Sequence, residues 1–197
     1  LPMEHAREIW VDPNVITGGV FAPMGRAAVE GGDYLVSGRW AWGSGSANCS
    51  WLLGGAVIMD GGEMRRLPSG APDHRMMVMR RAEVELIDTW DALGMRGTGS
   101  GDLAAKDVRV PQSRSVSFIT DTPREAGPLY RFAPFGLLAL GIAAVASGNA
   151  LGALDDLKAL AVAKKGQGSS RSLAERGVVQ ADFAVAQADL DAARALV

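Results

Sequence analysis

The stretch Gly38–Trp51 gathers three of the chain's five tryptophans with glycines, serines and the only cysteine. Residues two apart in a β-strand face the same way, so we expect Trp40, Trp42 and Ser44 to share one face. Such a surface is either a pair of core tryptophans that ends at a polar turn or a flat aromatic wall with a hydroxyl group at its rim. The second alternative suits a planar heterocyclic ligand.

A second glycine cluster is LGMRGTGSGD, residues 93–102. It has no Gly-Lys-Ser/Thr, and no helix pattern follows it that could hold a pyrophosphate at its N-terminus, so it is not a phosphate-binding loop of the known kinds. The cluster groups Arg96, Thr98 and Ser100 on a loop between two predicted strands. A simple turn and a ligand contact both account for it.

The sequence lacks the residue sets that carry catalysis without a cofactor. It has no Gly-x-Ser-x-Gly elbow and no His-Glu-x-x-His helix. His5 and His74 are the only histidines and lie far apart, and Cys49 is the only cysteine, so we expect no metal site. Any reaction of this protein therefore needs a cofactor to supply the reactivity.

Composition excludes several classes of partner. The chain is 48% hydrophobic, enough for a sizeable core, and its 20 basic and 22 acidic residues are well mixed. No broad electropositive face is predicted, so we expect neither nucleic acid nor a membrane as a partner. The single cysteine favours a reducing, cytoplasmic location.

The first 120 residues show mainly β patterns. A short helix is predicted near Met3–Trp10, followed by strands separated by glycine and proline turns such as Gly31-Gly32-Asp33. The predicted strands are 27–30, 34–42, 51–59, 76–81, 84–90 and 103–111. This spacing predicts an antiparallel β-barrel or sandwich of about 100 residues.

Beyond the connector 117–128 the pattern becomes helical. Pro134 suits a first helical turn, and the run 135–165 continues to an expected cap at Gly166. A second helix is predicted to start at the capping-box sequence Ser172–Glu175. Its apolar seam consists of Val179, Phe183, Ala186, Leu190, Ala193 and Val197.

The first of these helices is apolar on all faces, since residues 135–154 carry no charge. Such a helix either spans a membrane or forms the centre of a soluble bundle, and the acidic pair Asp155-Asp156 favours the bundle. Two helices cannot cover it, so we expect further helices or other subunits around it. The chain starts without methionine and ends within a helical pattern, and we expect it to be an internal fragment.

Three segments, in this order, resemble the acyl-CoA dehydrogenase fold superfamily: GGDYLVSGRWAWGSGSANCSWLLGGA, DTWDALGMRGTGSGDLAAKDVRVP and GLLALGIAAVASGNALGAL. The stretch FAPMGRA followed by GRWAWGSG is most similar to the oxygenase components of two-component flavin-dependent monooxygenases, which hydroxylate phenols and related compounds.

The resemblance implies an α+β, multi-domain protein. Residues 1–15 would be the tail of an N-terminal helical domain that is missing here. Residues 16–120 would form the β-barrel or sandwich that binds flavin. Residues 121–197 would form the first helices of an up-down C-terminal bundle. Related proteins are homotetramers.

The same resemblance implies the site residues. Trp42 matches an aromatic residue beside the isoalloxazine, and Ser44 matches a hydroxyl residue near flavin N5, where dehydrogenases usually carry threonine. Backbone groups of Val20, Phe21 and Ala22 would meet the pyrimidine ring. The resemblance also implies that the flavin tail or a neighbouring subunit is contacted by Arg96, Thr98 and Ser100.

The implied reaction uses FMNH2 or FADH2 from a separate flavin reductase, with O2 as co-substrate. A flavin C4a-hydroperoxide would hydroxylate an aromatic or polycyclic phenol, with an indole wall to exclude water and the Ser44 hydroxyl to hold the N5 proton. One alternative is an FAD-dependent acyl-CoA dehydrogenase, although Gly43-Ser44-Gly45 in place of Ile-Thr-Asn favours the oxygenase. Another is a flavin-binding or assembly module without turnover.

Overall fold

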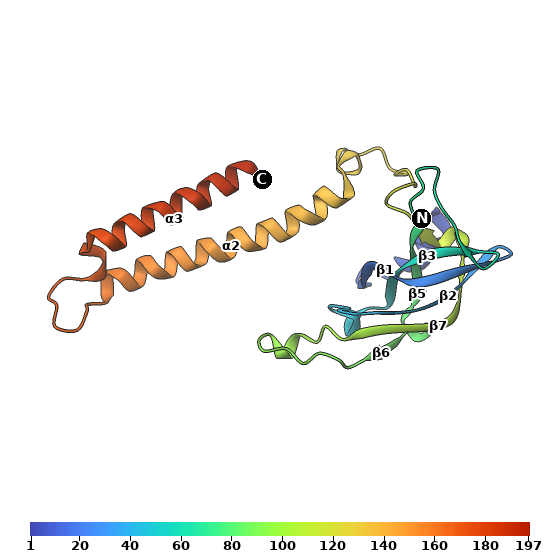
Figure 1. Cartoon of the computed structure of the whole chain (residues 1–197), viewed down its shortest axis with the longest axis horizontal. Coiled ribbons are helices and arrows are strands. Elements are labelled where there is room, and N and C mark those ends of the chain that lie inside the picture. Colours follow the sequence, from blue (N-terminus) through green and yellow to red (C-terminus); the bar gives the residue numbers. More distant parts are fainter. The chain divides into compact units, whose positions relative to one another are not determined.

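The computed structural model describes residues 1–197, which divide into two compact units, Leu1–Thr122 and Pro123–Val197. Figure 1 shows the strands of the first unit and the long helices of the second. The first contains a mixed β-sheet with one short helix, and the second contains two long helices.

The first unit is built on an eight-stranded sheet in the order β6-β7-β2-β1-β3-β5-β8, with β4 paired to β3. Its helix and strands are α1 Met3–Ile9, β1 Thr17–Glu30, β2 Asp33–Trp40, β3 Trp51–Asp60, β4 Glu63–Met64, β5 His74–Arg80, β6 Glu85–Ile87, β7 Asp102–Pro111 and β8 Ser115–Val116. The predicted helix near the N-terminus and the predicted turn at Gly31-Gly32 are confirmed.

The sheet departs in one place from the expected antiparallel arrangement. Strands β1 and β3 pair in parallel, with Thr17 opposite Trp51 and Ala28 opposite Met59. The prediction of an antiparallel domain assumed that neighbouring strands in the sequence pair through tight turns. Here β2 pairs with β7 on its other side, so β3 reaches β1 through a crossover and runs in the same direction.

The core of the sheet is organised around the indole of Trp40, which is fully buried. Glycines on three adjacent strands leave room for the ring: a Cβ atom added to Gly54 would lie 2.6 Å from it, one added to Gly38 would lie 3.0 Å from it, and one added to Gly25 would also overlap it. The indole Nε1 donates a hydrogen bond of 2.7 Å to the carbonyl of Gly55. The Trp40 indole therefore fills the space that side chains at positions 25, 38 and 54 would otherwise occupy.

Helix α1 is attached to the sheet by a second, smaller cluster. Ile9 packs in an apolar cluster with Trp51 and Val78. The guanidinium groups of Arg80 and Arg114 lie 5.0 and 5.3 Å from the centre of the Trp51 ring. Glu8 of the helix pairs with both arginines, so the helix is fixed by charge as well as by apolar contact.

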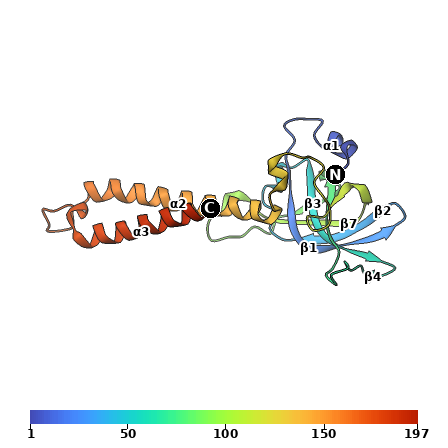
Figure 2. The ribbon, with the colours of Figure 1, turned by 90° about the horizontal axis from the view of Figure 1, so that it is seen from above.

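The second unit is a helical hairpin of α2 (Pro134–Ala163) and α3 (Gly177–Leu196), which lie side by side in Figures 1 and 2. Proline in the first turn of α2 is confirmed, but the helix ends at Ala163, before the cap expected at Gly166, because Lys164 is extended. The capping box of Ser172 and Glu175 is present, and it closes a 3₁₀ turn just ahead of α3.

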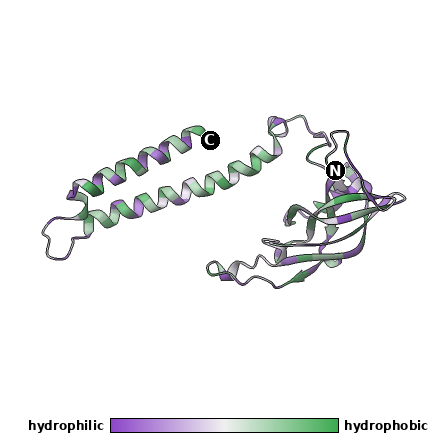
Figure 3. Cartoon of the chain, in the orientation of Figure 1, coloured by the Kyte–Doolittle hydropathy of each residue, from purple (hydrophilic) through white to green (hydrophobic).

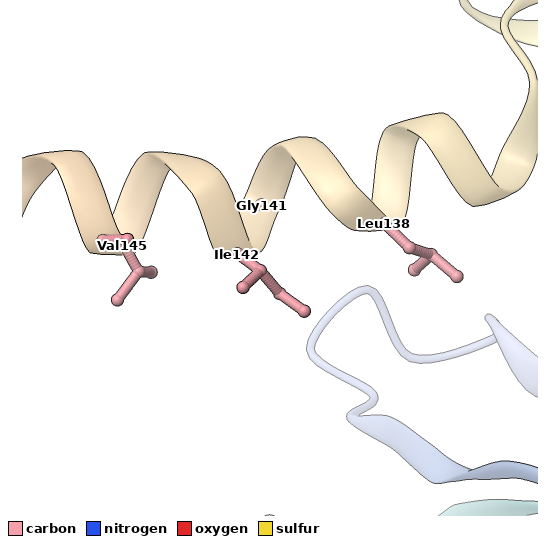
Figure 4. A pocket seen from close by; sticks show the side chains of 5 residues that line it. Leu138, Gly141, Ile142 and Val145 are labelled. Carbon is pink, nitrogen blue, oxygen red and sulfur yellow. The ribbon is translucent and has the colours of Figure 1, made fainter. Parts of the chain in front are cut away.

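Helix α2 is long and apolar enough, by length and composition alone, to cross a membrane. Figure 3 shows it predominantly apolar along its length. Large side chains on this helix, such as Ile142 and Val145, are exposed. A shallow hollow of about 490 Å³ lies beside them (Figure 4), and all of its walls come from α2: Leu138, Gly141, Ile142, Val145 and Ala146. It contains no group that could do chemistry.

The glycine layer around Trp40 predicts a strong effect of one methyl group. Gly54→Ala should lower the free energy of unfolding by about 1–3 kcal/mol, because the new Cβ overlaps the indole. Gly32→Ala is the matched control, since a Cβ there meets nothing within 4 Å. Urea denaturation measures both, and equal stability of the two variants would contradict the packing argument.

Candidate functional site

The segment after β2 turns Trp42 out of the sheet. Strand β2 ends at the buried Trp40, and Trp42 adopts a left-handed backbone conformation with φ of 62°. Trp42 is 76% exposed to solvent. The prediction that Trp40 and Trp42 share one face is therefore wrong, because the two-residue alternation stops with the strand. An exposed indole on a strained backbone is unusual, and such strain is concentrated at functional sites.

The two glycine clusters meet beside this tryptophan. The Ser44 and Ser100 hydroxyl oxygens lie 3.0 Å apart, and the Gly43 amide donates a 2.8 Å hydrogen bond to the Gly101 carbonyl. Pairing of β2 with β7, with Trp40 opposite Leu103, brings the loops together. Sequence reasoning nominated both serines but missed their contact, since nothing in the sequence specifies which strands pair.

Asp102 anchors the Ser100 side of this junction. Its two carboxylate oxygens accept hydrogen bonds from Arg39 Nε at 2.7 Å and Thr89 Oγ1 at 2.8 Å. These donors hold the pKa of Asp102 below its ordinary value, the Arg39 bond having the larger effect. The charged form of the carboxylate is therefore favoured, and its two hydrogen bonds tie the strand that follows Ser100 to Arg39 and Thr89.

Cys49 supports the Ser44 side from beneath. Its buried thiol lies 3.4 Å from the Gly45 carbonyl, and a Cβ added to Gly18 would lie 2.8 Å from its sulfur. Burial raises the pKa of the Cys49 thiol. Burial and the raised pKa both favour the neutral thiol, which is a poor nucleophile, so we interpret Cys49 as a packing residue of the loop.

The predicted backbone contacts at Val20, Phe21 and Ala22 lie in an irregular part of β1. Val20 packs against the core, the Phe21 ring contacts the His74 ring, and Ala22 is exposed. Ladder pairing with β3 is interrupted between Val20 and Gly25. Residues 21–24 therefore lie outside the regular ladder between β1 and β3.

Arg96 and Thr98 belong to a 3₁₀ turn, η3 (Arg96–Thr98), in the loop that precedes Ser100. The Arg96 guanidinium pairs with Asp91 at 3.2 Å and is largely exposed, and the Thr98 hydroxyl donates to the Met95 carbonyl at 2.8 Å. Both side chains thus bond within their own loop. Of the three residues predicted in this cluster, Ser100 is the one that contacts another predicted site residue.

The residues present fit a flavin. An exposed indole offers a flat apolar surface. The Ser44 hydroxyl, two residues further along the chain and paired with that of Ser100, can donate or accept at the edge of a planar ring. A Cβ added to Gly45 meets nothing within 4 Å, so the backbone beside Ser44 is open to close approach. No group of three or more His, Cys, Asp or Glu side chains that could hold a metal ion is found here.

The fold and the comparisons with known proteins agree on the class. Residues 140–197 match the family described as acyl-CoA dehydrogenase, C-terminal domain. The structure of XiaF from Streptomyces sp. in complex with FADH2 and glycerol superposes with a TM-score of 0.81 at 25% identity, over 98% of this chain and 51% of that one. The chain has the acyl-CoA dehydrogenase fold over the part of it that these proteins share, and the expected fold is confirmed.

Two relatives narrow the resemblance within that superfamily. Indole-3-acetate monooxygenase of Pseudomonas putida is 32% identical over 198 residues, which cover 99% of this chain and 48% of that protein. The oxygenase subunit HsaA of a flavin-dependent monooxygenase from Mycobacterium tuberculosis is 40% identical over 124 residues, 62% of this chain and 29% of that protein. The chain therefore spans about half the length, or less, of these curated relatives.

The left-handed backbone at position 42 predicts a difference in stability between two substitutions of Trp42. Trp42→Gly should be more stable than Trp42→Ala by about 1 kcal/mol, because both remove the indole but only glycine adopts a positive φ without a Cβ penalty. Thermal unfolding of the flavin-free protein measures the difference. Equal stabilities would show that the backbone at this position is not strained.

The burial of His74 predicts a loss of stability in acid. Burial lowers its pKa, an effect only partly opposed by a hydrogen bond to the Phe21 backbone and by Asp73. Its folded pKa lies below the unfolded value of about 6.5, so the unfolded state binds more protons as pH falls below that value. The contribution of the neutral His74 to the free energy of unfolding is fully present above a pH of about 6.5 and is lost as the pH falls below it.

Replacing the ring should remove this dependence. The free energy of unfolding of the parent protein should fall more between pH 7.5 and 5.5 than that of His74→Asn, with other groups cancelling in the comparison. Urea denaturation at the two pH values tests the difference. An identical pH dependence in the two proteins would contradict the burial of a neutral imidazole.

Proposed function

We propose that the protein to which this chain belongs is the oxygenase component of a two-component flavin-dependent monooxygenase. It would use reduced FMN or FAD and O2 to hydroxylate an aromatic or polycyclic phenolic substrate. The observation that carries the proposal is the exposed Trp42 indole on a left-handed backbone beside the Ser44–Ser100 hydroxyl pair. Relatives of at least 30% identity that are named as monooxygenases or as a hydroxylase support it.

Each residue of the proposed site has a distinct task. The flavin, when bound, supplies oxygen activation. Trp42 covers one face of the ring and excludes water, which protects reactive oxygen from loss as hydrogen peroxide. Ser44 is the proposed catalytic residue, because its hydroxyl would hold the proton at flavin N5. Backbone groups of Val20–Ala22 would contact the pyrimidine ring, and Arg96 and Thr98 would reach the flavin tail or a neighbouring subunit.

The proposed domain organisation has three parts, whereas the structure divides into two compact units, Leu1–Thr122 and Pro123–Val197. Residues 1–15 would continue an N-terminal helical domain, 16–120 would bind flavin, and 121–197 would begin the C-terminal bundle. In a homotetramer the outward apolar side chains of α2 would be covered by further helices or subunits. We further propose a separate flavin reductase as partner, a cytoplasmic location, and no membrane or nucleic-acid partner.

One experiment separates the proposed function from its alternatives. The full-length protein, with a flavin reductase, NADH, FMN or FAD and ¹⁸O2, is incubated with a panel of mono- and polycyclic phenols. Incorporation of one labelled oxygen atom into a phenol, detected by mass spectrometry, supports the oxygenase. Oxidation of an acyl-CoA thioester by bound FAD would instead identify a dehydrogenase. Flavin binding without any turnover would identify a binding or assembly module.

Ser44→Ala tests the catalytic assignment. The ratio of hydroxylated product to hydrogen peroxide should fall by about tenfold or more, as expected when a hydrogen bond at a reacting atom is lost. Flavin affinity should change less. Ser69→Ala, at an exposed loop serine, is the matched control. An unchanged ratio in Ser44→Ala would remove Ser44 from the catalytic machinery.

A further inference from the structure

The irregular part of β1 is a large bulge that folds over one glycine of β3. Val20 pairs with Gly54 and Gly25 pairs with Ala56, so residues 21–24 stand opposite Gly55 alone. The carbonyl oxygens of Phe21 and Ala22 both approach this glycine: a Cβ added to Gly55 would lie 2.6 Å from the Ala22 oxygen and would overlap the Phe21 oxygen too. The absence of a side chain at position 55 therefore allows the bulge to form.

His74 holds the bulge from the neighbouring strand. Its ring lies edge-on to the Phe21 ring with centroids 4.8 Å apart, and Phe21 stacks on Phe118 at 5.7 Å. The imidazole hydrogen-bonds to the Phe21 backbone. Its Nε2 atom is buried without a hydrogen-bond partner, so the bonding atom is Nδ1. The Nδ1–H donates to the Phe21 carbonyl, the acceptor that this backbone offers.

This contact sets the direction of one amide. In a planar trans peptide the carbonyl of one residue and the N–H of the next point in opposite directions, and the chain has no cis peptide bonds. With the Phe21 carbonyl turned toward Gly55 and His74, the Ala22 N–H points away from them. Pro23 has no N–H, so Ala22 supplies the donor at this turn of the bulge.

We propose that His74 is a positioning residue: through the Phe21 carbonyl, it orients the Ala22 N–H toward a carbonyl oxygen or unprotonated nitrogen of the flavin pyrimidine ring. The inference rests on the proposed function, since it needs the flavin to lie against the bulge. It gives a role to a histidine to which the proposed function assigns no other task. It also explains why a half-buried histidine with an unpartnered nitrogen occupies the first position of β5.

Two substitutions distinguish the hydrogen bond from the ring contact. In His74→Asn the amide nitrogen takes the place of Nδ1, whereas in His74→Gln it takes the place of Nε2. Both lose the aromatic contact with Phe21, so each is the control for the other. Hydrogen–deuterium exchange of residues 20–25 is measured in the flavin-free, full-length protein, and the dissociation constant for FMN and FAD is measured by fluorescence.

In His74→Gln the segment should exchange on the order of tenfold faster than in His74→Asn. The dissociation constant for flavin should rise about tenfold in the glutamine variant and stay within about threefold of the parent value in the asparagine variant. Equal exchange in the two variants would overturn the role of His74. Faster exchange without weaker flavin binding would overturn its link to the cofactor. If the parent protein binds no flavin, the proposed function fails, while the exchange result still decides whether His74 orients the bulge.

Discussion

The hydrogen bond from the Trp40 indole to the Gly55 carbonyl connects the core of the sheet to everything proposed for its surface. It places a large ring beneath three strands, and the glycines of those strands make the space that the ring fills. The same Gly55 accepts the bulge of β1 on its Cα side. Gly55 of β3 thus links the packing of the interior to the conformation of the backbone that is proposed to contact a ligand.

The position of Trp42 follows from this constraint. Trp40 fills the core and β2 ends at it, so the strand alternation does not extend to Trp42. Trp42 adopts a left-handed backbone conformation, and its indole lies outside the core. This left-handed backbone has an energetic cost, and it leaves the Trp42 side chain in a position to contact a ligand. Pairing of β2 with β7 places Ser100 beside Ser44, and the charged Asp102 fixes the turn between them and the sheet.

The sequence was sufficient for the types of element and for several of their limits. Proline at the start of α2, the capping box before α3 and the paired glycines between β1 and β2 act through local backbone chemistry, so they can be recognised without a fold. The resemblance of three separated segments indicated the superfamily. Local patterns were less reliable at the ends of elements, as at Trp42 and Gly166, where packing or a single extended residue stopped the repeat.

The sequence by itself therefore determined which elements are present: an apolar β-unit, a helical hairpin, and two glycine-rich loops that carry an indole and hydroxyl groups. Only the tertiary structure decided that β1 and β3 run in parallel, that Trp40 and Trp42 face opposite environments, and that Ser44 meets Ser100. It also decided that His74 holds the β1 bulge. The physical reason is that these relations depend on which strands pair and in which register, and non-local pairing is selected by the packing of the whole core, for which no short stretch of sequence carries a signal.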